Sequence, residues 1–333
     1  MSLDALNTKF TQHFRLSTPI AVAPMALATG GALAAACAQA GALGLVGGGY
    51  ADLVWTQREY TLALESLKND SRAQERLGCG FITWKLDENP QALDWVLTQK
   101  PCAIMLSFGD PRPYADRIHA AKAQLICQVQ RLDQVPQAIE AGANVIVAQG
   151  GEAGGHGANA LQGRSTFTLV PEVADYLANH SPATSLLAAG GVADGRGLAA
   201  ALMLGADGAL IGSRLWATHE SLAAPGAKTQ ATQTSGDGTA RSVIFDVLRR
   251  KNWPAPYDFR AIRNALHRKL EENIVELIAN PDDARADYDA GVQTGDFSRA
   301  HATVGEAVGL ITDIPNAKDL LTRITQQAHN LLS

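Results

Sequence analysis

Residues 185–213 read SLLAAGGVADGRGLAAALMLGADGALIGS and contain two apolar runs, at 185–189 and 208–211. Between them, residues 195–204 have the spacing of apolar side chains that is typical of a helix. Continuous apolar runs, in contrast to alternating ones, are typical of strands that are covered on both faces, as parallel strands are. Gly205 follows the helical segment, and glycine readily adopts the left-handed conformation that ends a helix. The stretch therefore predicts a strand, a helix and a second, parallel strand.

The same pattern recurs along the chain. Further apolar runs that end in Gly, Pro or a polar residue occur at 19–24, 43–47, 77–82, 102–108, 124–129 and 144–148. Helix-type segments separate most of them, at 31–40, 53–69, 90–97, 111–120, 135–141 and 171–178. Eight strands that alternate with helices predict an α/β fold, a (β/α)8 TIM barrel, with a doubly wound open sheet as the structural alternative.

The pattern changes after Ser213. Residues 223–238 are small, polar and turn-rich, which predicts a loop, whereas 261–279 and 317–332 show helical spacing of Leu, Ile and Val. The WPAPY stretch at 253–257 contains two prolines and cannot be a regular helix. We therefore expect residues 1–218 to form the barrel. Residues 219–333 are expected to form a mainly helical region packed at the barrel mouth, including the last barrel helix.

Charge and hydropathy limit the classes of partner. The net charge is -5 and the sequence pI is about 5.9, whereas nucleic acid and anionic membranes call for clustered Lys and Arg. The longest basic run, Arg249-Arg250-Lys251, is short and is typical of a solvated helix end. Residues 1–14 lack the apolar core of a secretory signal, and the Ala-rich stretch at 30–46 lacks the bulky residues of a membrane span. We expect neither a nucleic acid nor a membrane partner, and the sequence leaves monomer and homo-oligomer both open.

The four cysteines, Cys37, Cys79, Cys102 and Cys127, are well separated and form no CxxC pair. Each falls in an apolar stretch, which is the usual place of a small buried thiol. The pattern predicts free thiols in a reducing cytoplasm, and a thiol nucleophile is the less favoured interpretation because none stands beside an obvious base.

A glycine-containing pair of small residues follows each of the last two predicted strands. Gly190 and Gly191 come after the seventh strand, and Gly212 and Ser213 come after the eighth. Loops after these two strands, with a helix N-terminus nearby, often bind phosphate in this fold. The backbone amides of these four residues and the Ser213 hydroxyl are therefore predicted to hold a phosphate dianion. The alternative is that the glycines only shape tight turns, but two pairs on neighbouring strands favour phosphate.

No dinucleotide-binding or P-loop motif accompanies this predicted phosphate site. GxGxxG is missing after the first strand, and GxxxxGK[ST] does not occur. A Rossmann NAD site is therefore disfavoured.

His156 stands in AQGGEAGGHG, residues 148–157, directly after the sixth strand. Histidine exchanges protons near neutral pH, and the surrounding glycines have no side chains to shield it from a ligand. The alternative is a hydrogen-bonded loop histidine, which is the preferred interpretation for His13, His119 and His180. Because Glu152 lies four residues away in a loop and no second ligand has metal-binding spacing, no metal site is predicted.

Together, these motifs resemble the nitronate monooxygenase family, formerly called 2-nitropropane dioxygenases. The resemblance rests on AQGGEAGGHG, on LLAAGGVADGRG at 186–197, on ALIGSRLWAT at 209–218 and on PIAVAPMALATGG at 19–31. It covers most of residues 15–220 and continues through 243–264 and 305–311.

The resemblance implies FMN bound non-covalently at the barrel mouth. It places Ala23, Pro24 and Met25 against the isoalloxazine, Gln128 at its polar edge and Gly151 beside it. The phosphate would lie on the residues already named, Gly190, Gly191, Gly212 and Ser213. Some relatives carry Lys near Gln128, and a neutral side chain there offers less stabilisation to a reduced, anionic flavin.

The resemblance also implies a reaction. His156 matches the catalytic histidine, which would hydrogen-bond the nitro group of a nitronate or act as a base toward a neutral nitroalkane. An alkyl nitronate such as propionate 3-nitronate would be oxidised by O2 to a carbonyl compound and nitrite.

Three other functions remain open on this scaffold. Two are redox enzymes, an NAD(P)H:quinone reductase and an FMN-dependent enoyl-carrier-protein reductase. The third is a barrel that binds a phosphorylated metabolite without redox chemistry, with His156 as a structural residue. Four aromatic residues are candidates for the substrate entrance, with core packing as the alternative: Trp55, Trp84, Tyr257 and Phe259.

Overall fold

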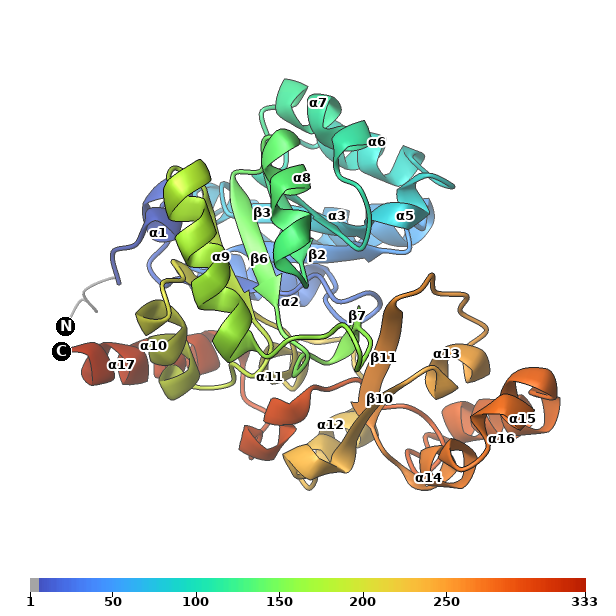
Figure 1. Cartoon of the computed structure of the whole chain (residues 1–333). Helices are drawn as coiled ribbons and strands as arrows, with labels where there is room; N and C mark the ends of the chain where they lie inside the picture. Colours follow the sequence, from blue (N-terminus) through green and yellow to red (C-terminus); the bar gives the residue numbers. More distant parts are fainter. Residues whose placement is uncertain (1–5) are drawn as a thin grey trace.

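Eight parallel strands form the centre of the computed structural model, which describes residues 6–333 (Figure 1). The strands are β1 (Ile20–Val22), β2 (Gly44–Gly49), β3 (Leu77–Ile82), β4 (Ala103–Ser107), β5 (Gln124–Val129), β6 (Val145–Gln149), β8 (Ser185–Ala189) and β9 (Gly208–Ile211). Their order in the sheet is β1-β9-β8-β6-β5-β4-β3-β2, and a parallel bridge between Ala21 and Leu43 joins the two ends. The predicted (β/α)8 barrel is confirmed, and the open doubly wound sheet is excluded.

Helices cover the outside of the barrel between successive strands. They are α2 (Gly31–Gln39), α3 (Leu53–Ser66), α4 (Ser71–Gln74), α5 (Thr83–Leu86), α6 (Gln91–Thr98), α7 (Arg112–Ala120), α8 (Val135–Glu140), α9 (Thr166–His180) and α10 (Gly195–Met203), with α1 (Lys9–Phe14) before the first strand. Gly205, just after α10, has a φ of 93°, which confirms the helix-ending role predicted for it. Asp194 caps the start of α10 by accepting from the amides of Arg196 and Gly197.

In β2, β4, β5, β6 and β8, neighbouring residues belong to two different hydrophobic clusters. One cluster contains Leu45, Met105, Ile126, Val147 and Leu187, and the other contains Val46, Ile104, Leu125, Ile146 and Leu186. Successive side chains of a strand point to opposite faces, so both faces of the sheet are covered by apolar side chains. This explains why the strand sequences are continuously apolar.

The region after the eighth barrel strand is mainly helical. It contains α11 (Ser213–Trp216), α12 (Pro225–Ala231), α13 (Ile244–Leu248), α14 (Ala265–Glu271), α15 (Ile274–Ala279), α16 (Asp282–Thr294) and α17 (Ala317–Leu332), with 3-10 turns at Gly236–Gly238 and Glu306–Leu310. α17 packs against α10 and α2 and so occupies the place of the last barrel helix. Figure 1 shows α17 beside the barrel, while α13 to α16 lie apart from it beyond the barrel mouth.

Two predictions for this region were wrong. Residues 223–238, predicted as a loop, contain α12, which begins at Pro225 because proline fits the first helical turn. The side chains of Ala227 and Ala231 are buried, and Lys228 donates hydrogen bonds to the carbonyl oxygens of Thr218 and Ser221. Tertiary packing therefore outweighs the turn-rich composition.

The second error concerns residues 261–279, whose helical spacing predicted one helix. β11 (Tyr257–Ile262) occupies its start, and the remainder is divided between α14 and α15 at Asn273, which caps α15. Apolar spacing persists across the break, so the pattern alone does not reveal it.

A small antiparallel sheet joins the C-terminal region to the barrel mouth. Its strands are β10 (Thr239–Ser242), β11 and β7 (Gly155–Ala158), in the order β10-β11-β7. β7 belongs to the glycine-rich segment after β6, which was predicted as a loop. His156 pairs with Phe259 of β11, so the C-terminal region fixes the position of the histidine.

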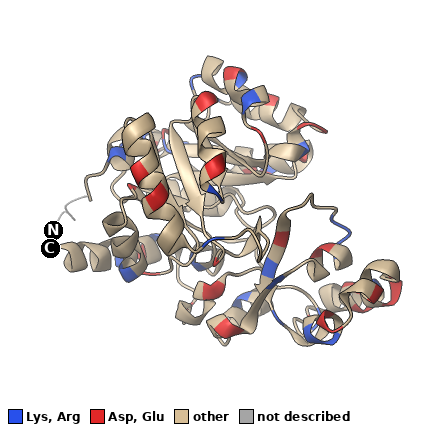
Figure 2. Cartoon of the chain, viewed as in Figure 1, with Lys and Arg blue, Asp and Glu red and all other residues tan. Residues whose placement is uncertain are grey.

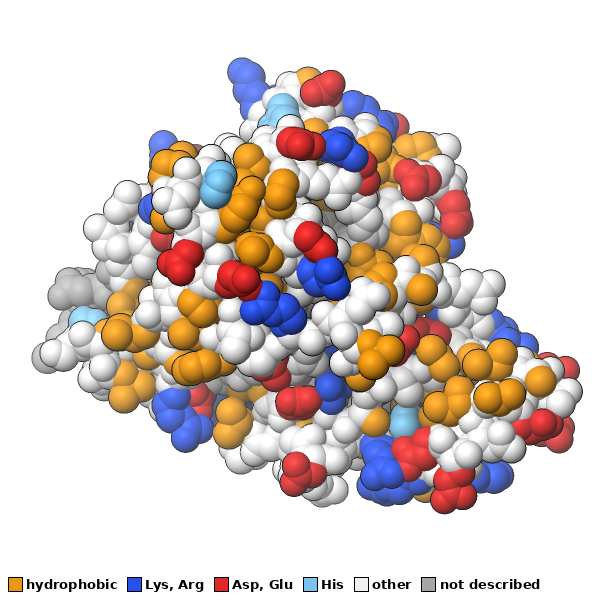
Figure 3. All heavy atoms as spheres, viewed as in Figure 1, with side chains coloured by type: hydrophobic (Ala, Val, Ile, Leu, Met, Phe, Trp, Pro, Cys, Tyr) orange, Lys and Arg blue, Asp and Glu red, His pale blue; other side chains and the backbone are white. Residues whose placement is uncertain are grey.

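Charged side chains of both signs are distributed over the helices and do not gather into one basic face (Figure 2). The face in Figure 3 likewise has acidic, basic and hydrophobic side chains interspersed. None of the helices formed by residues 6–333 combines the length and the apolar character that crossing a membrane requires.

Candidate active site

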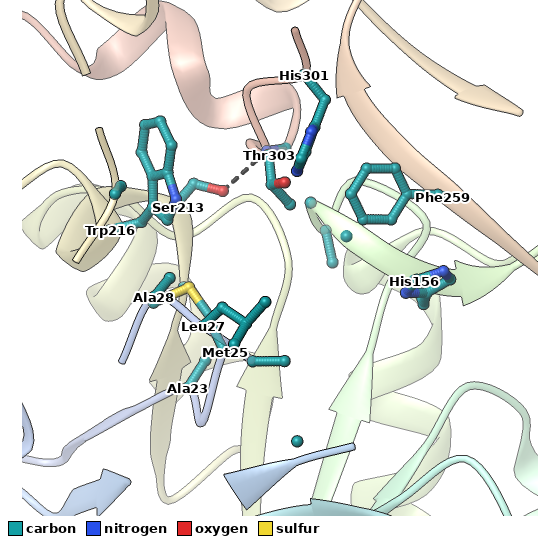
Figure 4. Close-up of a pocket in the computed structure, with 18 of the residues that line it drawn as sticks. Ala23, Met25, Leu27, Ala28, His156, Ser213, Trp216, Phe259, His301 and Thr303 are labelled. Atoms are coloured by element: carbon teal, nitrogen blue, oxygen red, sulfur yellow. Dashed lines mark hydrogen bonds between the residues drawn. The ribbon is translucent and has the colours of Figure 1, made fainter. Parts of the chain in front are cut away.

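A cavity of about 650 Å³ lies at the carboxyl ends of the barrel strands and is bounded on its far side by the C-terminal region. Almost all of the predicted site residues line it: Ala23, Pro24, Met25, Gln128, His156, Gly190, Gly191, Gly212 and Ser213. Figure 4 shows Ser213 and His156 on opposite sides of the cavity, with Met25 and Leu27 below Ser213. Residues predicted from separate motifs therefore meet in one place.

The turn after β1 forms the floor of the cavity, and two glycines make room for it. A Cβ atom on Gly47 would lie 2.4 Å from the carbonyl oxygen of Met25, and one on Gly80 would lie 2.3 Å from Cγ of Pro24. Larger residues in β2 and β3 would push this turn out of place. The glycines of the neighbouring strands thus let the segment from Ala23 to Met25 lie low in the barrel mouth.

The predicted phosphate site consists of exposed backbone amides at the ends of β8 and β9. Gly190 and Gly191 have φ values of 100° and 79°, a conformation that favours glycine. Within residues 6–333, the amides of Gly191, Gly212 and Ser213 donate no hydrogen bond to another backbone group. Ser213 is the first residue of α11, and amides at a helix start are suited to bind an anion.

The space beside these amides is open. A Cβ atom on Gly191 would meet only Cβ of Glu152, at 3.9 Å, and one on Gly212 would approach no atom closer than Sδ of Met25, at 3.6 Å. Ser213 Oγ accepts a hydrogen bond from the Gly305 amide at 2.8 Å, which leaves its own proton free to donate. Free donors above an apolar floor fit a phosphorylated, planar cofactor such as FMN.

Gln128 belongs to a chain of side-chain amides at the base of the cavity. Its Nε2 donates to Oε1 of Gln149 at 3.0 Å, and Gln149 Nε2 donates to the carbonyl oxygen of His156 at 3.2 Å. Gln130 also donates to Gln149 Oε1, at 3.0 Å. Gln149 therefore connects the barrel interior to β7.

Gly151 is the one predicted site residue that does not line the cavity in the part of the chain that the structure describes. Its amide donates to the carbonyl oxygen of Arg164, and its own carbonyl accepts from Arg241 and Arg260. Arg241 also donates to the carbonyl oxygens of Gly155 and Ala153. Gly151 thus lies in the hydrogen-bonded support behind the glycine-rich segment.

His156 is buried in the cavity wall and held on two sides. Its Nε2 lies 3.0 Å from both Oδ1 and Oδ2 of Asp246. The indole of Trp253 stacks on the imidazole, with ring centroids 3.4 Å apart and an interplanar angle of 12°. Phe259, its strand partner, contacts it at a centroid distance of 4.8 Å. The ring therefore has a fixed orientation.

The protonation of His156 follows from this environment. Burial lowers the pKa of the imidazole to about 4, although its hydrogen bond to the Asp246 carboxylate and the charge of that carboxylate oppose the shift. The ring is therefore neutral at neutral pH. Because the Asp246 carboxylate accepts from Nε2, that nitrogen carries the proton and Nδ1 carries the lone pair. The geometry suits a proton acceptor.

A second histidine, His301, lines the cavity above Phe259 (Figure 4). Its Nδ1 lies 2.7 Å from the hydroxyl oxygen of Tyr288. Burial lowers the pKa of His301 to about 3 and raises the pKa of Tyr288 to about 12, so the pair is neutral at neutral pH.

The sequence did not reveal Asp246, Trp253 or His301 as site residues, because each lies far from His156 in the chain and in no short motif. The only signal was the family-like stretch at 243–264. The basic run at 249–251 was predicted to be a solvated helix end. It does follow α13, but Arg249, Arg250 and Lys251 line the cavity, and the Arg249 side chain is only 13% exposed.

Of the four aromatic candidates for the entrance, Phe259 lines the cavity. Trp84 and Tyr257 contact the edge of Trp253, and Trp55 packs against the barrel core.

Comparison with known proteins gives a consistent assignment. The sequence profile of the nitronate monooxygenase family matches residues 7–327. A nitronate monooxygenase, npaC, of Metarhizium robertsii is 34% identical over 93% of this chain and 91% of its own length. A nitronate monooxygenase of Neurospora crassa is 31% identical over 98% of this chain and 94% of its own.

Solved structures agree on the fold. FabK from Thermotoga maritima aligns with a TM-score of 0.82 at 26% identity, covering 98% of each chain. A nitroalkane oxidase from Streptomyces ansochromogenes aligns with a TM-score of 0.79 at 23% identity, covering 98% of this chain and all of its own. The solved structures establish the fold, and the sequence matches also establish the family: the chain belongs to the nitronate monooxygenase family, a family of flavin-dependent oxidoreductases.

Proposed function

We propose that this protein binds FMN and oxidises alkyl nitronates, such as propionate 3-nitronate, with O2 to carbonyl compounds and nitrite. The observation that carries the proposal is the position of His156. A neutral imidazole, oriented by Asp246 and Trp253, faces the same cavity as the free backbone amides at the ends of β8 and β9. We call the residues that carry these amides, Gly191, Gly212 and Ser213, the glycine cradle. Both sequence relatives named above are nitronate monooxygenases, which supports this choice of substrate.

The residues that would hold FMN are those of the floor and the cradle. The amides of Gly191, Gly212 and Ser213 would donate to its phosphate, and Pro24 and Met25 would support the ring system from below. Gln128 would meet the polar edge of the ring. When bound, FMN supplies the redox chemistry, and the protein orients the substrate and shields the reaction from bulk water.

His156 would position the substrate and take up its proton. The lone pair on Nδ1 can accept a proton from the α-carbon of a neutral nitroalkane, and general-base catalysis of this type contributes roughly 10²- to 10⁴-fold. A nitronate has already lost that proton, so for this substrate the imidazole would act by positioning. We therefore expect nitronates to be used more efficiently than the corresponding nitroalkanes.

An enoyl reductase is the second candidate, because FabK from Thermotoga maritima is 26% identical and covers the whole fold. An NAD(P)H:quinone reductase is a third function that this cavity could accommodate. Both differ from the leading proposal in one respect that can be measured, since their flavin is reduced by NAD(P)H.

The deciding experiment is anaerobic reduction of the purified, flavin-loaded protein. Ethyl nitronate, propionate 3-nitronate, NADH and NADPH are each added, and flavin absorbance is followed by stopped flow. Rapid bleaching by the nitronates, with formation of nitrite when O2 is admitted, supports the proposal.

The opposite result would assign the chain to the reductases. Bleaching by NADH or NADPH and no response to either nitronate would exclude nitronate oxidation, and reoxidation by a quinone or an enoyl thioester would then separate the two reductases. A protein that purifies without flavin and cannot be loaded with FMN would exclude all of these flavin-dependent functions. The remaining candidate would then be the barrel that binds a phosphorylated metabolite without redox chemistry.

A further inference from the structure

Arg249 is a cation of the cavity wall without a matching acceptor. It directly follows α13, its side chain is 13% exposed, and it lines the cavity. Its Nη1 atom is buried and has no hydrogen-bond partner within residues 6–333. The carboxylate within 4 Å is that of Asp246, whose Oδ1 lies 3.8 Å from Nη1, too far for a hydrogen bond.

Three other arginines of the C-terminal region each have an acceptor for at least part of the guanidinium, although Nε of Arg241 has no partner within residues 6–333. Arg250 donates to both carboxylate oxygens of Asp289, at 3.2 and 2.8 Å. Arg260 pairs with Glu306 at 2.9 Å, and Arg241 donates to backbone carbonyl groups. Arg249 therefore differs from its neighbours, although all belong to the same C-terminal region.

The surroundings hold the guanidinium in place without accepting a hydrogen bond from its Nη1. It lies over the ring of Phe259, 4.6 Å from the centroid, and Phe259 also contacts His156. Lys251 adds a second positive charge to the same wall, with Nζ 4.4 Å from the ring centroid of Tyr50. The Asp246 carboxylate is already hydrogen-bonded to His156. Arg249 and Lys251 therefore place two cations in this wall next to the imidazole, with the Asp246 carboxylate 3.8 Å from Arg249 Nη1.

Guanidinium donors without an acceptor cost free energy, and an anionic ligand that reaches Arg249 from the cavity would recover part of this cost. The planar fork of Arg matches two oxygens held in one plane, as in a carboxylate, and can donate to both at once. A nitronate group presents the same arrangement of two oxygens on a planar centre. The chemistry of the unmatched group thus specifies a small planar anion.

We propose that Arg249 binds the substrate directly by donating to a planar pair of anionic oxygens, either the nitronate group itself or a carboxylate elsewhere on the same molecule. This proposal rests on the proposed function for the identity of the substrate, but not for the existence of the anion site. Arg249 would be a binding residue, and its contact with Phe259 would place the bound anion beside His156.

The test compares Arg249→Met, which removes the charge, with Arg249→Lys, which keeps the charge but loses the fork. Flavin content and the midpoint of thermal unfolding are measured first, so that a folding defect is recognised. Affinity for propionate, a carboxylate that cannot be oxidised, is measured on the holoprotein through flavin absorbance and tryptophan fluorescence, since Trp253 lies in the same wall. The kcat/KM values for ethyl nitronate and propionate 3-nitronate are then determined.

Two outcomes would support the proposal, and they distinguish whether Arg249 binds the nitronate group or a carboxylate of the substrate. If Arg249 binds the nitronate group, Arg249→Met lowers kcat/KM about 10- to 100-fold for both nitronates. If it binds a carboxylate, the variant weakens propionate binding and lowers kcat/KM by this factor for propionate 3-nitronate, with less than about a twofold change for ethyl nitronate. Arg249→Lys should lie between the wild type and Arg249→Met in either case.

The matched control is Arg250→Met, which removes an equal charge one residue away from a side chain that already has a partner. An equal loss of anion affinity in Arg249→Met and Arg250→Met would indicate that the anion responds only to the total positive charge of the wall. That result would overturn direct binding by Arg249. No loss in Arg249→Met for any of the three anions would overturn it as well. Binding of propionate that depends on Arg249, in a protein that oxidises no nitronate, would refute the proposed function and leave the anion site standing.

Discussion

Nε2 of His156 lies 3.0 Å from both carboxylate oxygens of Asp246, a residue 90 positions later in the chain. The histidine comes from the segment after β6, and the aspartate comes from α13 of the C-terminal region. The pair therefore exists only when the C-terminal region is docked on the barrel mouth. It determines which ring nitrogen carries the proton, and hence what the imidazole can do.

Asp246→Asn should lower kcat/KM by roughly 10- to 100-fold, because an amide does not fix the ring and its tautomer as a carboxylate does. The loss should be larger for a neutral nitroalkane than for its nitronate, since only the nitroalkane needs a proton acceptor. Steady-state kinetics with nitroethane and ethyl nitronate measure the difference. An equal loss for both substrates would show that Asp246 acts on binding and not on proton transfer. Asp282→Asn, an exposed position on α16, is the control.

His156→Ala should keep the flavin and lose roughly 10²- to 10⁴-fold in kcat/KM for a nitroalkane. The imidazole faces Ser213 across the cavity and is not part of the glycine cradle, so cofactor affinity should be nearly unchanged (Figure 4). Flavin content is measured by absorbance and turnover by nitrite release. Normal turnover in this variant would refute the assigned role of His156.

Ser213→Ala should weaken FMN binding about tenfold, which is the expected effect of losing one hydrogen bond to a charged group. The change also removes the acceptor of the Gly305 amide, so the segment that follows His301 should loosen at the same time. Titration of the flavin-free protein with FMN, followed by flavin fluorescence, gives the affinity. Ser298→Ala, at an exposed position, serves as the control, and an affinity equal to that of the wild type would contradict the phosphate assignment.

The free energy of unfolding should fall as the pH decreases from about 6.5 to 4. Burial lowers the pKa of His156 to about 4 and that of His301 to about 3, both below the value of about 6.5 expected in the unfolded chain. Above pH 6.5 both states are neutral and the two residues have no effect. Below it the unfolded chain takes up protons that the folded protein does not, which costs up to about 1.4 kcal/mol per pH unit for each residue.

Urea unfolding of the holoprotein at several pH values measures this slope. His301→Gln should reduce the slope between pH 6.5 and 4 relative to the wild type, whereas His180→Gln, at an exposed position on α9, should leave it unchanged. An identical slope in wild type and His301→Gln would mean that His301 is not a buried neutral group.

Much of the barrel is encoded in short segments of the sequence. The predicted bounds of β3, β5, β8 and β9 equal the observed ones, since a continuous apolar run ending at Gly or a polar residue is sufficient to define a buried parallel strand. The glycine cradle was also predictable, because its position follows from the strand ends. β7 was missed, since four residues of Gly, His and Ala have no strand pattern and extend only because β11 pairs with them.

The wall opposite the cradle could not be predicted in the same way. Asp246 and Trp253 reach His156 through the pairing of β7 with β11 and the packing of α13, and both are contacts between distant parts of the chain. No local pattern distinguishes Asp246 from any other acidic residue near a helix start. The solvated helix end predicted for the basic run was wrong for Arg249 for the same reason. The run does follow α13 and Arg250 is exposed, but Arg249 is largely buried against Phe259.

The packing of α17 against α10 and α2 has a consequence for biosynthesis. Side chains of this last helix, including Leu320, Leu321 and Ile324, belong to the same apolar cluster as Leu33 of α2 and Leu198 of α10. A ribosome releases these residues after all the barrel strands, so the barrel of each nascent chain emerges with that patch uncovered. Premature termination near residue 316 would yield a polypeptide that has every active-site side chain discussed above but is prone to aggregate and to be recognised by chaperones and proteases.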